Sequence, residues 1–255
     1  MSAYLEKFLS YQAQLTDLVA KRPEVIGLIF VGSAAATERV DQYSDQDFFL
    51  VVTQGAGEAF RQDLSWLPNH ETIAMHPRET AHGLKVVYQN GDVLEFAVFE
   101  DSELELSAAN DYKVALDRAN LAERIAKIAH LSIPSEVDRA QELELFLSLI
   151  LIGVGRARRG EVLAAEQHIK SYALNHALRL IRLAKPVESS KRDTLNAYRR
   201  FEFDYPELGR KLATVMLMPT EDSAKSLAVL VLREIRGDDR EFALYRVVAD
   251  RLGWD

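Results

Sequence analysis

Hydrophobic positions follow two different patterns along the chain, one in each half. Residues 3–20 carry apolar side chains at mixed three- and four-residue spacings, which is typical of a helix with one buried face. Residues 25–31 and 47–53 are short, nearly uniform apolar runs that include β-branched residues. Such runs predict strands that are buried on both faces. The chain is therefore expected to begin with a helix that precedes two core strands.

Further strands are predicted around the dipeptide Asn90-Gly91. The apolar runs 84–88 and 93–99 flank it, and Asn-Gly between two apolar runs is the strongest short-range signal of a β-hairpin. Residues 71–75 are a weaker strand candidate, and residues 112–116 fit a short edge strand. These strands can join the first two in one sheet.

Helical patterns interrupt the first half and fill the second. The small residues 33–37 favour a helix start directly after the first strand, and residues 55–66 also have a helical pattern. Every segment after residue 116 is helical in pattern. The helices expected in the second half span residues 136–158, 162–184, 191–201, 206–216, 221–236 and 239–252.

The boundary between the two halves is predicted at Pro134 and Ser135. Ser135 fits a helix N-cap, with Asp138 as the carboxylate three residues later. Strands first and helices afterwards predict an α+β fold, with a sheet-containing domain at residues 1–133 and an all-α helical bundle at residues 134–255.

Composition narrows the range of functions. The chain has 255 residues, a formal net charge of −8 and no cysteine. The absence of cysteine excludes disulfides, zinc-thiolate sites and thiol nucleophiles. The acidic balance lacks the basic stripe that a long nucleic acid requires. It is compatible with a cationic substrate, although many proteins carry such a charge without that role.

Neither a targeting segment nor a membrane span is predicted. The first residues mix charged and apolar side chains and lack the order of a signal peptide. The most apolar run, residues 145–154, has ten residues, whereas a span needs about 20. We therefore expect a cytoplasmic protein in which this run is a buried helix.

Asp45 and Asp47 are the first candidate site residues. Alternate residues of a strand share a face, so both carboxylates project the same way at the mouth of the strand at residues 47–53. Like charges in this position repel, and a divalent cation would relieve the repulsion. Taken alone, the pair also fits a simple polar strand entrance.

Glu95 is the only charged residue in the run 93–99. A buried carboxylate without a partner costs several kcal/mol, so Glu95 needs either a basic partner or a metal ion. If its strand lies beside that of Asp47, three carboxylates converge. Such an oxygen-rich cluster suits Mg²⁺ bound together with substrate phosphates.

Gly32 and Ser33 lie where the first strand ends. The bare backbone of Gly32, the hydroxyl of Ser33 and the N–H groups of a following helix could all face a phosphate. The alternative for this common dipeptide is a simple turn.

Together these residues resemble the signature of the DNA polymerase β-like nucleotidyltransferase superfamily. Val31-Gly32-Ser33 is followed by eleven residues and then by Asp45-Gln46-Asp47-Phe48, and Glu95 fits the third carboxylate. The resemblance covers residues 24–99. Residues 41–47 and 94–100 are similar to enzymes that modify lincosamide and aminoglycoside antibiotics, and the helical half is similar to their C-terminal domain.

The resemblance implies an activity and a set of roles. Asp45 and Asp47 would hold two Mg²⁺ ions, Glu95 would ligate metal or act as a base, and Gly32 and Ser33 would bind the nucleotide phosphates. The sheet would have mixed strand directions with flanking helices. A nucleoside monophosphate, commonly AMP, would pass from a nucleoside triphosphate to a hydroxyl in a cleft between the domains.

Other candidates lie in the helical half. A cation reaching the triphosphate is expected there, and we favour Lys170 over Arg156 and Arg159, with a solvated helix face as the alternative. Acidic residues that could supply a base or line an acceptor pocket, but that also fit ordinary helix surfaces or a loop, are Glu142, Glu144, Glu202, Asp204 and Glu207.

Three functions follow from this site. The leading one is nucleotidylation of a small hydroxylated molecule, with an aminoglycoside or lincosamide antibiotic as the example, and antibiotic resistance as the role. The others are a nucleotide-binding antitoxin-like or regulatory protein and a nucleotidyltransferase that acts on a protein. The intact carboxylates argue against a site that only binds. The sequence leaves a homodimer open.

Overall fold

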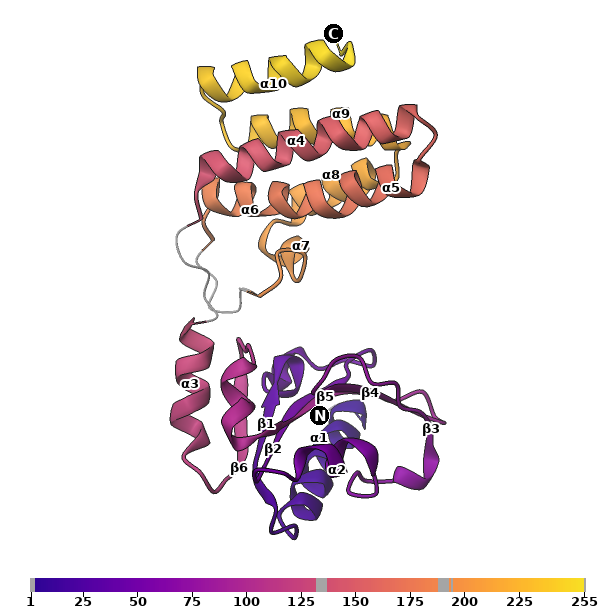
Figure 1. The fold of residues 1–255 in the computed structure, drawn as a ribbon, viewed down its shortest axis with the longest axis vertical. Helices are drawn as coiled ribbons and strands as arrows, with labels where there is room; N and C mark the ends of the chain where they lie inside the picture. The colour runs from indigo at the N-terminus through magenta and orange to yellow at the C-terminus, as the bar shows by residue number, and fades with distance from the viewer. Residues whose placement is uncertain (1–2, 132–136, 188–192, 194, 255) are drawn as a thin grey trace. The chain divides into compact units, whose positions relative to one another are not determined.

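A computed structural model describes residues 3–131, 137–187, 193 and 195–254 of the chain. The chain divides into two compact units, Met1–Ile133 and Pro134–Asp255, and Figure 1 shows the ribbon of each. The predicted boundary at Pro134 and Ser135, and the predicted N-cap at Ser135, lie outside the described residues.

The first unit is an α+β structure built on a six-stranded mixed sheet, which confirms the predicted fold class for this half. The strand order is β3-β4-β5-β2-β1-β6, with β2 and β5 parallel and the other pairs antiparallel. Its helices and strands are α1 (Ala3–Val19), β1 (Val25–Val31), β2 (Gln46–Val52), α2 (Gly57–Gln62), β3 (Ile73–Met75), β4 (Gly83–Tyr88), β5 (Val93–Glu100), β6 (Tyr112–Asp117) and α3 (Leu121–Leu131).

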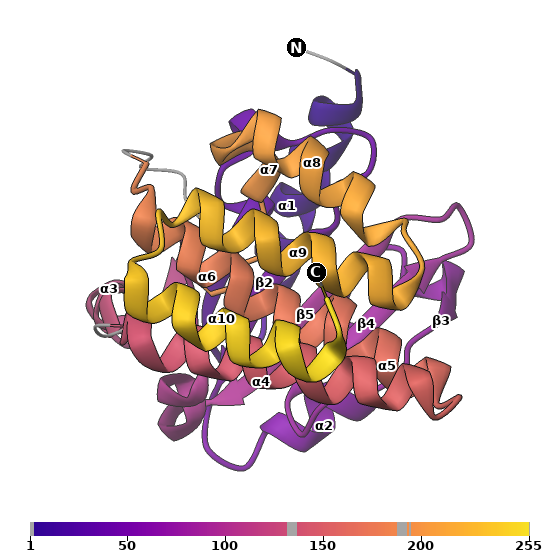
Figure 2. The ribbon, with the colours of Figure 1, turned by 90° about the horizontal axis from the view of Figure 1, so that it is seen from above.

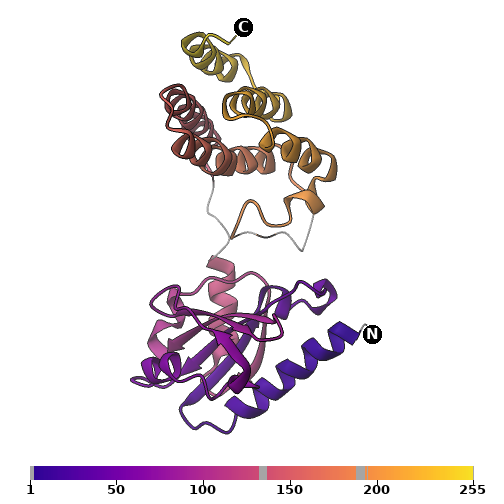
Figure 3. The same cartoon turned by 90° about the vertical axis from the view of Figure 1, so that its right-hand side faces the viewer.

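The two faces of this sheet have separate cores. Phe48 and Leu50 of β2 belong to the core that includes Leu15 of α1. Val51 belongs to the core that includes Ile125 of α3. In Figure 3 the helix α1 runs along the sheet as the indigo helix near the N-terminus. The uniform apolar run in β2 is thus explained by burial on both faces, as predicted.

Two predicted helices of this unit are wrong in extent. Residues 32–34 and 37–39 form single 3-10 turns, η1 (Gly32–Ala34) and η2 (Thr37–Arg39), in place of a helix that starts after β1. The Arg39 side chain donates a hydrogen bond to the Gly32 carbonyl and so ties the segment into a compact loop. Likewise, α2 ends at Gln62, because the Asp63 carboxylate accepts from the Ser65 N–H and forms a turn there.

The second unit is an all-α structure. Its helices are α4 (Arg139–Arg158), α5 (Val162–Gln167), the π-helix η5 (His168–Ala173), α6 (Leu174–Ala184), α7 (Phe201–Asp204), α8 (Pro206–Met216), α9 (Thr220–Glu234) and α10 (Asp239–Leu252). The helices α5, η5 and α6 follow one another without a gap, which confirms the continuous helix predicted at residues 162–184. Figure 2 shows α9 and α10 crossing the view side by side.

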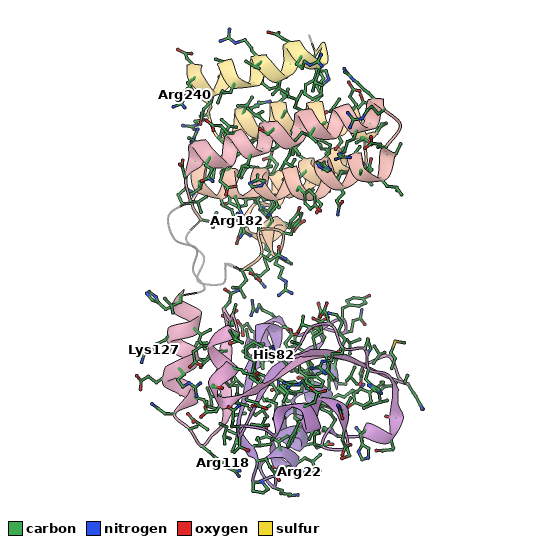
Figure 4. The ribbon with its side chains drawn as sticks, viewed as in Figure 1. Arg22, His82, Arg118, Lys127, Arg182 and Arg240 are labelled. Atoms are coloured by element: carbon green, nitrogen blue, oxygen red, sulfur yellow. The ribbon has the colours of Figure 1, made fainter. Side chains whose placement is uncertain are left out.

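Local residues explain where these helices begin and end. The Asp138 carboxylate accepts from the N–H groups of Ala140 and Gln141, so Asp138 is the N-cap of α4. The helix predicted at residues 191–201 is wrong for its described part, since 195–200 is not helical and Arg200 has a left-handed backbone with φ of 61°. Buried Arg182, labelled in Figure 4, donates to the carbonyls of Asp193 and Arg199 instead.

The apolar run at residues 145–154 lies in α4, but it is buried on one face only. Leu147 and Ile150 are in the core, whereas Leu145 and Ile152 are exposed. Among the helices that the structure describes, none combines the length and the apolar character needed to cross a membrane.

Candidate active site

Three carboxylates converge at one end of the sheet in the first unit. Asp45, Asp47 and Glu95 each offer an oxygen, and these oxygens all lie within 4.8 Å of one another. Asp47 and Glu95 are register partners on the parallel strands β2 and β5. Asp45 immediately precedes β2 and shares the face of Asp47, because side chains alternate along a strand. The condition for convergence, that the strand of Glu95 lies beside that of Asp47, is therefore met.

The carboxylates lie just beyond the core that α3 covers. Phe49 and Ala97 are register partners on β2 and β5, two residues after Asp47 and Glu95, and both pack against that core. Phe49 also packs edge to face on Phe99, with a centroid separation of 5.5 Å. Asp47 and Glu95 are only half-buried. The sheet therefore fixes the carboxylates in place and leaves them open to a ligand.

Glu95 has a basic partner in addition to its acidic neighbours. The Lys85 Nζ lies 2.5 Å from Glu95 Oε1 and 3.0 Å from Glu79 Oε2. The hydrogen bond to Glu95, followed by the one to Glu79, raises the pKa of Lys85. The Glu95 side chain is 38% exposed, so the expectation of a buried carboxylate is wrong, because the core under α3 begins two residues further along β5, at Ala97. Of the two predicted kinds of partner, the basic one is present in Lys85, and the metal ion stays a prediction.

The turn at Gly32 lies directly against Asp47. Gly32 has a φ of +59°, and a Cβ at this position would lie 3.0 Å from Asp47 Oδ2. Its N–H donates to the Asp111 carbonyl at 3.1 Å. Ser33 follows in the same 3-10 turn and is half-buried. Because η1 is a single turn, the predicted helix N-terminus is wrong, and a phosphate-binding role for the bare backbone and the hydroxyl stays a prediction.

Arg39 holds this turn in place, and the sequence patterns did not single it out. Its Nη2 lies 3.0 Å from the Gly32 carbonyl and 2.5 Å from Asp111 Oδ2. The signal that could have found it is simple, since Arg39 is the only basic residue between Ser33 and Asp45.

A buried pair of amides, also missed by the sequence patterns, joins the turn to β2. Gln12 of α1 donates through Nε2 to the Ala34 carbonyl at 2.9 Å and to Gln46 Oε1 at 3.2 Å. Gln46 donates in turn to the Phe8 carbonyl at 3.0 Å. Since Gln46 lies between Asp45 and Asp47, α1 fixes the turn and the start of β2 relative to each other.

The first unit thus brings together Gly32, Ser33, Asp45, Asp47 and Glu95. Lys170 belongs to the second unit, where its Nζ donates to the Met218 carbonyl at 2.8 Å and lies 2.9 Å from Glu166 Oε2.

Other candidates of the second unit are also paired within it. Arg156 and Arg159 both form ion pairs with Glu161. Glu142 is buried and lies 2.6 Å from His176 Nδ1.

Three further acidic candidates of this unit have arginine or lysine partners. The Glu144, Asp204 and Glu207 carboxylates lie 3.8, 3.9 and 2.8 Å from the side-chain nitrogens of Arg240, Arg182 and Lys211, respectively.

Comparisons with known proteins find similarity in structure only. No protein-family model matches the chain, and no curated protein matches it. The chain is similar to an aminoglycoside 6-adenyltransferase from Bacillus subtilis, with 16% identity and a TM-score of 0.35, over 100% of this chain and 93% of that one. It is also similar to a nucleotidyltransferase-like protein from Exiguobacterium sibiricum, with 13% identity and a TM-score of 0.38, over 89% of this chain and 74% of that one.

A third similar structure is the STING-associated CdnE c-di-GMP synthase from Capnocytophaga granulosa. The identity is 12% and the TM-score 0.31, over 97% of this chain and 81% of that one. Similarity at these TM-scores carries no functional inference, so a function has to be supported by the chain's own site.

Proposed function

We propose that this protein is a metal-dependent nucleotidyltransferase that moves a nucleoside monophosphate, with AMP as the expected group, from a nucleoside triphosphate to a hydroxyl of a small molecule. The observation that carries the proposal is the convergence of Asp45, Asp47 and Glu95 within 4.8 Å beside the positive-φ turn at Gly32. Carboxylates that hold metal ions next to a phosphate-binding turn are what this transfer needs.

The three carboxylates fit Mg²⁺. They supply only oxygen ligands, and each is half-buried, so a metal held there would keep positions for substrate phosphates. When bound, the metal would act as a Lewis acid on the phosphate oxygens. Asp45 and Asp47 would hold it, with Glu95 as a further ligand or as the base.

Groups of the chain can also bind the phosphates and take up the proton of the acceptor. Gly32 leaves room for a phosphate to approach the backbone, and the Ser33 hydroxyl can donate to a phosphate oxygen. In the transfer, the acceptor oxygen forms a bond to the α-phosphorus while the bond from that phosphorus to pyrophosphate breaks. The proton of the acceptor passes to a carboxylate of the site or to water.

In this proposal the second unit binds the acceptor. Lys170 remains the predicted nucleotide-binding cation. Replacing Lys170 with alanine should raise the apparent KM for the nucleotide. Lys185→Ala is the matched control, because Lys185 is paired with Glu234 in the same unit. An unchanged KM in the Lys170 variant would remove it from the site.

The proposal is tested by incubating the protein with α-labelled nucleoside triphosphates, Mg²⁺ and a panel of aminoglycosides and lincosamides. Transfer of label to a panel member, with release of pyrophosphate, supports a small-molecule acceptor. Label on the protein itself or on a companion protein would instead support a protein acceptor. Absence of pyrophosphate release with every acceptor would contradict the small-molecule proposal.

A further inference from the structure

Lys85 lies between two acids that belong to different parts of the first unit. Its ammonium is 2.5 Å from Glu95 of the carboxylate cluster and 3.0 Å from Glu79, which precedes β4. Lys85 and Glu95 are register partners on the antiparallel strands β4 and β5. Glu95 therefore has Lys85 on one side and Asp47 on the other.

The second acid is held beside Lys85 independently of the cluster. The Glu79 N–H donates to the Gly83 carbonyl at 2.9 Å, and the Lys85 N–H donates to the Pro77 carbonyl at 3.1 Å. These backbone bonds fix the segment that carries Glu79 against β4. The backbone that carries this second acceptor is thus positioned by bonds that do not involve Glu95.

A divalent cation among the three carboxylates would change how strongly Lys85 is attracted to Glu95 and to Glu79. The cation takes up the negative charge of Glu95 and repels the nearby ammonium. The side chains of Lys85 and Glu95 are each about one-third exposed, and pairs with such exposure are weak enough to be displaced.

We propose that Lys85 is an exchangeable counter-ion of the metal site, shared between Glu95 and Glu79 in the metal-free protein and held by Glu79 alone when a divalent cation binds. This inference rests on the proposed function, since it takes the carboxylates as the metal site. Of the two roles open to Glu95, metal ligand or base, it selects the metal ligand.

The test is Mn²⁺ binding measured by calorimetry on the full chain. Lys85→Met should bind Mn²⁺ about 3- to 10-fold more tightly than the wild type, because the competing charge is gone. Glu79→Gln should bind it more weakly, because Lys85 loses its alternative partner. In the Lys85→Met background, Glu79→Gln should have much less effect. Lys21→Met is the control for net charge, since the exposed Lys21 precedes β1, at the end of that strand opposite Gly32.

Two outcomes separate this inference from the proposed function. If Asp47→Asn binds Mn²⁺ as tightly as the wild type, the carboxylates are not the metal site and the proposed function is contradicted. If Asp47→Asn lowers the affinity while Lys85→Met matches Lys21→Met, the counter-ion role alone is overturned.

Discussion

Asp47 and Glu95 face each other in register across the parallel strands β2 and β5. Parallel strands run in the same direction, so both residues lie near the amino ends of their strands. The antiparallel strand β1 finishes at the same end of the sheet, so Gly32, which follows it, lies beside Asp47. Groups that are far apart in the sequence therefore lie together at one end of the sheet.

Asp47→Asn should abolish most transfer while the fold is kept. The substitution keeps the shape of the side chain but removes a charge that would hold metal, and we expect a loss of at least ~100-fold in rate, the scale of losing one group that stabilises transition-state charge. Asp45→Asn should behave in the same way. Pyrophosphate release measures the rate, and Asp92→Asn is the control. Full activity in either site variant would contradict the metal assignment.

Gly32→Ala should lose both stability and activity. A left-handed backbone costs about 1–2 kcal/mol in a residue with a Cβ, and this Cβ would lie 3.0 Å from Asp47 Oδ2. Gly91→Ala is the matched control, because Gly91 also has a positive φ, of +86°, but no atom within 4 Å of the added Cβ. Denaturant unfolding should show a loss in both variants, and pyrophosphate release a loss in Gly32→Ala alone. Equal activity in the two variants would argue against a role for this turn.

The local parts of this site could be predicted from the sequence. The period of two along a strand places Asp45 and Asp47 on one face, and the Asn-Gly turn predicts the hairpin that carries Glu95. These features depend on residues close together in the chain, where propensity and steric rules act directly.

The contacts of the site between distant parts of the chain could not be predicted from the sequence. Lys85 becomes the partner of Glu95 only through the register of β4 and β5, and Gln12 meets Ala34 only because α1 packs on the sheet. At the turn after β1, a local prediction was wrong. Its small residues favour a helix, but the hydrogen bond from Arg39 to the Gly32 carbonyl belongs to a tighter loop, and tertiary contacts override propensity.

Gln12→Met should lower the rate more than it changes the KM for nucleotide. The variant keeps the volume of the side chain but leaves the Ala34 carbonyl and Gln46 Oε1 without this donor, which costs about 1–3 kcal/mol for buried groups. A small shift between the turn and Asp47 would then impair alignment for transfer. Gln14→Met, on the exposed side of the same helix, is the control. A loss of stability with an unchanged rate would show that the amide pair is only structural.

Asp117→Asn should make the first unit less stable at neutral pH and its stability less dependent on acid. Asp117 ends β6, and its carboxylate accepts from the N–H groups of Ala119, Leu121 and Ala122 at the start of α3. Burial opposes ionisation here, but these N–H groups outweigh it and lower the pKa of Asp117.

A pKa that is lower in the folded state gives stability that is present above the unfolded pKa, about 3.9 for Asp, and lost as the pH falls through the folded value. Removing the charge should therefore cost about 1 kcal/mol at pH 7, the usual scale of a helix cap. The difference between wild type and variant should shrink below pH ~4 as the wild-type carboxylate is protonated. Urea unfolding from pH 7 to pH 3 measures this, with the exposed Asp17→Asn as the control. A difference that stays constant across this range would show that the charge of Asp117 does not stabilise α3.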